Sequence, residues 1–164
     1  DFIIVGPSHD PAKLKEARDI FEAMQKLTLG QASFLSRDDN SGTYKKELSL
    51  WQLAEIEIKD NDNWYLRNGS GMGITLNMAS EMGAYTISDR GTWLSFHNRQ
   101  YLDILFEKDE LLFNPYSIIV VNPKKFPHVE YEKAMTFINW LLSDEGKSTI
   151  NEFKLNGQQL FYTY

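Results

Sequence analysis

The chain has 164 residues, a formal net charge of -6 and 42% hydrophobic residues. This length is enough for one hydrophobic core or two small lobes, and no apolar run is long enough to span a bilayer. An acidic chain with no basic stripe cannot displace phosphate counterions efficiently, which argues against nucleic acid as the main partner. The absence of cysteine excludes disulfides and thiolate metal sites.

The chain opens on the apolar run from Phe2 to Val5, which predicts a strand at the very beginning. A strand in this position is typical of a chain that continues an existing sheet, so we interpret the sequence as a fragment or a processed chain. Asp10 as the N-cap and Pro11 as the first helical residue predict a helix over residues 11–29, which Gly30 ends.

The later elements are predicted from apolar spacing and from breaker residues. We expect strands over 32–35, 84–88, 102–106 and 116–121, and helices over 42–57, 72–82 and 129–142, with a short helix from Thr92 and another ending at Phe153. Strands that alternate with helices predict an α/β fold with mostly parallel pairing. In such folds, ligands bind where strands end and helices begin.

The strongest candidate for such a site is the stretch from Ser36 to Thr43 (SRDDNSGT), which leads into the second long helix. Arg37 carries a permanent charge in a fork geometry that suits oxyanions, and the first N–H groups of a helix have no intrahelical partner. We therefore expect an anion site here. The alternative is that Ser41 or Thr43 only caps the helix and that the aspartates only form a turn.

Two further junctions have the same strand-to-helix character. The glycines at 69, 71 and 73 do not match the dinucleotide fingerprint, so we expect them to form a tight turn into a helix with a free N-terminus. At the third junction, Arg90 either pairs locally with Asp89 or contacts the ligand. The three junctions could share one pocket.

Other functions have weaker support in the sequence. None of the three histidines, His9, His97 and His128, lies in a recognisable nucleophile motif, so we expect no catalytic residues. The acidic stretches that begin at Asp38 and Asp60 lack the glycine that a calcium-binding EF-hand loop requires. A pocket for a small organic ligand would use aromatic side chains such as Trp51, Trp64, Tyr85 and Trp93, but their helical or strand spacing favours a place in the core or on a lobe surface.

Taken together and in order, these segments resemble the periplasmic tungstate-binding proteins of ABC transporters. The residues that carry the resemblance are Ser36-Arg37-Asp38-Asp39, Ser41-Gly42-Thr43, Lys46-Glu47, Gly71-Met72-Gly73, Thr75-Leu76, Ala84-Tyr85-Thr86, Asp89-Arg90-Gly91-Thr92, Asn114-Pro115-Tyr116 and Val121-Asn122-Pro123. The sequence departs from the family at Asp38, where the family usually has glycine. It also lacks the family's N-terminal stretch, rich in threonine and serine, which supplies part of the oxyanion site.

The resemblance implies a type II periplasmic-binding-protein-like α/β fold, with one complete lobe plus part of the other. Residues 8–112 would form the second, inserted lobe, and residues 1–7 and 113–164 a partial first lobe, with hinges near 6–8 and 112–115. The intact protein would capture tungstate, or molybdate, between two closing lobes in the periplasm, or outside the cell as a membrane-anchored lipoprotein. It would deliver the anion to an ABC permease and need no cofactor. Because an incomplete lobe exposes sheet edge and apolar surface, we expect a dimer, a swapped arrangement or a missing companion segment.

The resemblance also implies a set of ligand-binding residues that hold tungstate as an oxyanion, with no metal site. The set is Ser36, Arg37, Ser41, Gly42, Thr43, Met72, Gly73 and Arg90. Arg37 would supply charge, the hydroxyl residues would donate through side chain or backbone, and Met72 and Gly73 would donate backbone N–H groups. The alternatives are an effector-sensing domain of a transcription regulator and a binding protein for another small anion or organic ligand.

Overall fold

The computed structural model describes residues 1–163 and divides the chain into two compact units. The first unit is Asp1–Asn114, and the second runs from Pro115 onward. We expected residues 1–7 to belong with residues 113–164, but they lie inside the first unit, because they form a strand that is paired on both sides by strands of that unit. None of the helices in residues 1–163 combines the length and the apolar character that a membrane span requires.

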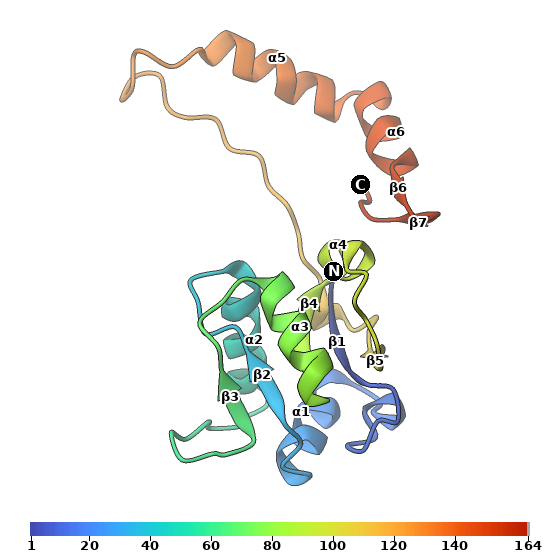
Figure 1. Cartoon of the computed structure of the whole chain (residues 1–164). Coiled ribbons are helices and arrows are strands. Elements are labelled where there is room, and N and C mark those ends of the chain that lie inside the picture. Colours follow the sequence, from blue (N-terminus) through green and yellow to red (C-terminus); the bar gives the residue numbers. More distant parts are fainter. Residues whose placement is uncertain (164) are drawn as a thin grey trace. The chain divides into compact units, whose positions relative to one another are not determined.

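The first unit is built on a three-stranded sheet and a two-stranded sheet, which one bridge joins (Figure 1). Strand β1 (Phe2–Pro7) lies between β4 (Thr86–Asp89) and β5 (Leu102–Phe106) and is antiparallel to both. Strands β2 (Phe34–Ser36) and β3 (Tyr65–Arg67) pair in parallel, and a parallel bridge from Phe34 to Tyr85 joins β2 to the chain that enters β4.

The expected parallel pairing is therefore correct for β2 with β3 and for the bridge from β2 to the chain that enters β4, and it is wrong for both pairings of β1. Strand–helix–strand alternation fixes the direction only of strands that a crossover joins. A crossover connects β4 to β5, and strand β1 lies between these two strands. It runs antiparallel to both of them. The strand itself is confirmed, and all six of its residues are buried.

The helices of the first unit are α1 (Ile20–Leu29), α2 (Gly42–Leu53), α3 (Met72–Met82) and α4 (Arg90–Ser95), with 3-10 turns η1 (Leu14–Glu16) and η2 (Glu110–Leu112). The single helix expected over 11–29 is wrong. Asp10 has a left-handed φ of 44° and accepts from the Leu14 N–H, which forms a turn rather than a helix. Asp19 is the real N-cap of α1, since it accepts from the Glu22 N–H at 2.8 Å. Helix α2 ends before the expected residue 57, because Glu55 has a φ of 55°.

The core of the first unit includes a cluster of aromatic rings. Phe34 meets Trp51 edge to face at 5.3 Å between ring centroids, and it stacks on Tyr65 at 5.8 Å. Trp51 and Trp64 meet at 5.7 Å. The expectation that these tryptophans belong to the core is confirmed.

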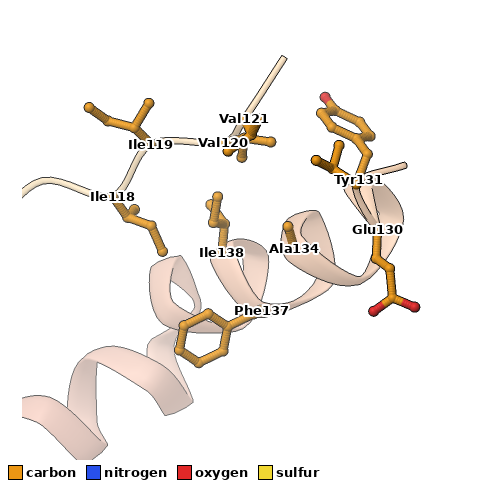
Figure 2. Close-up of a pocket in the computed structure, with 10 residues that line it drawn as sticks. Ile118, Ile119, Val120, Val121, Glu130, Tyr131, Ala134, Phe137 and Ile138 are labelled. Atoms are coloured by element: carbon orange, nitrogen blue, oxygen red, sulfur yellow. The ribbon is translucent and has the colours of Figure 1, made fainter. Parts of the chain in front are cut away.

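The second unit contains α5 (Tyr131–Leu142), α6 (Asp144–Glu152) and the short strands β6 (Lys154–Leu155) and β7 (Gln158–Gln159). The strand expected over 116–121 does not form, because no strand in the described part of this unit pairs with it. Its side chains and those of α5 line an apolar pocket, in which Ile118 and Ile138 face the same space (Figure 2). Among the described residues of this unit, only Gly146 is buried.

Candidate functional site

Two of the three expected junctions lie together at one edge of the sheet. Ser36 and Arg67 are partners at the ends of the parallel strands β2 and β3, so the loops that follow them start side by side. The Asn68 N–H donates to the Ser36 carbonyl and the Ser70 N–H donates to the Arg37 carbonyl, both at 3.2 Å. The N-termini of α2 and α3 therefore open from loops that are bonded to each other.

The loop before α2 gathers its donors on one carboxylate. Asp39 accepts from Arg37 Nη2 at 2.5 Å, from Ser41 Oγ at 2.5 Å and from the Ser41 N–H at 3.1 Å. Burial opposes ionisation of this group, but the bonds from Ser41 and Arg37 prevail and lower the pKa of Asp39. The loop thus already stabilises a negative charge with one guanidinium, one hydroxyl and one backbone N–H.

Arg37 has donor capacity to spare. Its side chain is only 14% exposed, and its ion pair with Asp39 uses the Nη2 end of the guanidinium. The Nε atom is buried and has no hydrogen-bond partner within residues 1–163. A buried donor without a partner costs free energy, so an acceptor that reached Nε would be stabilised there.

At both helix N-termini, glycine residues have free space beside their backbone. Ser41 is the N-cap of α2, because its Oγ accepts from the Tyr44 N–H at 3.1 Å, so the capping interpretation describes one of its bonds correctly. Gly71 is the N-cap of α3 and provides no side-chain cap. A Cβ atom built on Gly42, Gly71 or Gly73 would meet no atom within 4 Å. Packing inside this chain therefore does not require glycine at these positions.

A buried network lies beneath the loop. Ser36 is fully buried, and its Oγ accepts from the Asp38 N–H at 3.2 Å. Glu47, on the buried face of α2, is 2% exposed and accepts from the Tyr65 hydroxyl and from Trp51 Nε1 at 3.4 Å. Burial raises the pKa of Glu47 to about 7. Burial and the neighbouring Glu47 raise the pKa of Tyr65.

Arg90 forms its ion pairs with residues outside these two loops. Its Nε and Nη2 donate to the two carboxylate oxygens of Asp1 at 2.7 Å each, and Nη2 lies 2.8 Å from Glu107. The expected local pair with Asp89 is wrong, because Asp89 is the N-cap of α4 and accepts from the Thr92 N–H at 2.7 Å. The structure thus brings Ser36–Thr43 and Met72–Gly73 together. Arg90 instead bonds to Asp1, which precedes β1, and to Glu107, which follows β5.

Three polar residues of this region were not among the expected ligand-binding residues. Asp39 could have been found as an aspartate two residues before a serine, a spacing that favours a local side-chain-to-backbone bond. Asn68 Oδ1 accepts from the Ser70 N–H at 2.9 Å by the same pattern. Glu47 gave no such signal, because a single glutamate in a helix is usually solvated.

Comparisons with known proteins bear on the fold and the family of this chain. The model of the PBP superfamily domain matches residues 1–145. The solved structure of the tungstate-binding protein TupA from Desulfovibrio alaskensis G20 aligns with a TM-score of 0.86 and 43% identity, covering 99% of this chain and 66% of that one. The expected periplasmic-binding-protein-like α/β fold is confirmed by these two matches.

Two curated relatives carry names that state a ligand class. The tungstate-binding protein TupA of Peptoclostridium acidaminophilum is 48% identical over 155 residues, which cover 93% of this chain and 54% of that protein. A putative ABC transporter anion-binding protein of Haloferax volcanii is 41% identical over 167 residues, which cover 99% of this chain and 48% of that protein. The chain spans about half the length of these relatives. It belongs to the PBP superfamily.

Proposed function

We propose that this protein binds tungstate, with molybdate as a second ligand, as the substrate-binding component of an ABC transporter. It would act in the periplasm, or outside the cell as a membrane-anchored lipoprotein, and would deliver the anion to the permease. The proposal is supported by relatives that are named for tungstate or anion binding and for ABC transport. The matches are with binding proteins, so the proposed role is capture rather than catalysis.

One observation carries the proposal: three donors of the loop converge on the carboxylate of Asp39. A carboxylate and a tetrahedral oxyanion are both acceptors only, so a donor set that suits one also suits the other. The dianion has more charge and more oxygens to share among donors. It would therefore compete with Asp39 for Arg37 and Ser41.

The proposed donor set follows from the geometry. Arg37 supplies the charge and its unpartnered Nε, Ser41 its hydroxyl, and Gly42 and Thr43 the first N–H groups of α2. Met72 and Gly73 supply the first N–H groups of α3. Helix N-termini favour anions through both free donors and the helix dipole. Ser36 supports the loop from below, and Arg90 lies outside this set.

Calorimetric titration of tungstate tests the proposal, with sulfate in parallel. We expect tungstate-selective binding that Arg37→Ala weakens at least about a hundredfold, since a charged donor bond contributes roughly 1.5–3 kcal/mol and the charge is lost as well. Arg18→Ala is the control, because that side chain is 86% exposed. The titration is run on residues 1–164 and on the natural chain in its full length. Absence of tungstate binding in both would overturn the proposal.

A steric variant probes the same site from the α3 side. Alanine is a better helix former than glycine by roughly 1 kcal/mol, and a Cβ on Gly73 meets no atom of the chain within 4 Å. Gly73→Ala should therefore keep or raise the melting temperature while it weakens tungstate binding, because the methyl group takes up space in front of the N–H groups. Unchanged affinity would remove α3 from the site.

A further inference from the structure

Glu47 is an ionisable side chain that the proposed donor set does not use, although it lies directly beneath the loop. It is 2% exposed and is surrounded by polar groups of three elements: Ser36 of β2, Tyr65 of β3 and Trp51 of its own helix. The Tyr65 hydroxyl and Trp51 Nε1 both donate hydrogen bonds to the same carboxyl oxygen of Glu47. The network is closed off from water on the Ser36 side, since Ser36 is fully buried.

Ser36 connects this network to the loop. Its hydroxyl lies beside the Glu47 carboxyl and the Tyr65 hydroxyl in the buried network, and its oxygen accepts from the Asp38 N–H at 3.2 Å. A hydroxyl has one proton to donate and two lone pairs to accept. When Glu47 is a carboxylate, it attracts that single proton. When Glu47 is neutral, its own proton can go to the Ser36 oxygen, and the Ser36 proton is released toward the loop.

The charge of Glu47 also matters to an anion above it. The charged and titratable groups around it are Asp38 on the loop, Tyr44 on α2, Tyr65 on β3, and Arg67, whose guanidinium lies 5.0 Å from the Tyr65 ring centroid. Asp38 adds negative charge beside Glu47 and further disfavours its ionised form. A dianion held by the loop would act in the same direction and more strongly, because like charges in a poorly solvated site repel.

We propose that Glu47 is a positioning residue of the oxyanion site: it is neutral when the dianion is bound and orients Ser36 and the loop, and it opposes binding when ionised. This inference rests on the proposed function. It adds that anion capture is coupled to the uptake of one proton. The coupling operates near neutral pH, because burial raises the pKa of Glu47 to about 7 in the chain without ligand.

The sign of the effect follows from linkage. A bound dianion raises the pKa of Glu47 further, so the bound form holds the proton at pH values where the free form has lost it. Affinity is greatest below about pH 7 and falls by up to tenfold per pH unit above it, until the bound form also loses its proton. Tungstate is a dianion throughout this range and contributes no titration of its own.

The test is tungstate titration of the full-length natural chain from about pH 6.5 to about pH 8.5, in buffers with different ionisation enthalpies. At about pH 8, the dependence of binding heat on buffer should show uptake of close to one proton. Glu47→Gln mimics the neutral form, since its amide accepts from Tyr65 and donates to Ser36. It should bind with pH-independent affinity, and more tightly than wild type at about pH 8.5.

Tyr65→Phe provides a second variant that conserves the ring stacking with Phe34. It removes a donor that stabilises the carboxylate, so the pH at which affinity begins to fall should rise. If Glu47 had a purely structural role, both variants would lower tungstate affinity equally at every pH. The pH at which affinity begins to fall would then stay as in wild type. Wild-type binding that is tight but independent of pH, without proton uptake, would overturn this inference alone, whereas no binding at any pH would overturn the proposed function as well.

Discussion

The two units of the chain both carry large apolar side chains but bury them very differently. In the first unit, Ile3, Ile4 and Phe34 have no exposed surface. In the second, Ile119 is 87% exposed and Phe137 is 55% exposed. The difference follows from pairing: β1 is covered by strands on both sides, whereas the segment 116–121 pairs with no strand among the described residues.

This comparison explains where a binding site can be held rigidly. Donors must be fixed within a fraction of an ångström, and that precision requires a packed layer beneath them. The loop with Arg37 rests on buried Ser36 and Glu47, which in turn contact the aromatic core. The second unit has no comparable layer of its own in the described part of the chain.

The sharpest test of the comparison truncates one phenylalanine in each unit. Phe34→Ala should lower the free energy of unfolding by roughly 3–5 kcal/mol, because a fully buried ring leaves a cavity. Phe137→Ala should change it by less than about 1 kcal/mol, because the ring is already more than half exposed. Urea denaturation followed by circular dichroism measures both. Equal losses would contradict the account of the second unit.

A second test uses one glutamate from each unit. The folded pKa of Glu47, about 7, lies above its ordinary value of 4.5, so the folded state binds the proton more tightly than the unfolded state. The contribution of Glu47 to stability is therefore fully present below about pH 4.5 and declines as the pH rises to about 7, by roughly 3 kcal/mol at 1.36 kcal/mol per unit.

Glu47→Gln should remove this decline and be more stable than wild type at about pH 8. Glu132→Gln on exposed α5 is the control and should leave the pH profile of stability as in wild type. The profiles come from melting temperatures in matched buffers. A decline that survives Glu47→Gln would assign the titration to another group.

The smallest expected effect concerns ion pairs. Arg90 holds Asp1 and Glu107 together with a side chain that is 19% exposed, so Arg90→Ala should cost about 1 kcal/mol. Lys133→Ala breaks a pair whose side chains are 77% and 69% exposed and should cost close to nothing. Chemical denaturation measures both costs. A large loss of tungstate affinity in Arg90→Ala would return Arg90 to the site.

Some of this molecule could be predicted from sequence because the signal is local. Four consecutive apolar residues specify β1, and Ser41 before Gly42 specifies the start of α2. The direction of β1 and the absence of a strand at 116–121 could not be predicted, because both depend on which distant strands are present to pair.

The candidate site shows the same division. Arg37 could be identified from its place before a helix, but its partner Asp39 was interpreted only as part of a turn. On α2, Glu47 is buried, whereas the neighbouring Leu48 is 43% exposed. The sequence did not indicate this burial, because it depends on polar partners that Tyr65 and Trp51 provide to the glutamate.

The most direct measurement is a crystal structure of the protein with tungstate, in which the anomalous signal of tungsten locates the anion. The account predicts a single strong peak within hydrogen-bond distance of Arg37 and of the first N–H groups of α2 and α3, with the carboxylate of Asp39 no longer occupying all three of its present donors. A peak elsewhere in the molecule, with Asp39 still bound to Arg37 and Ser41, would contradict it.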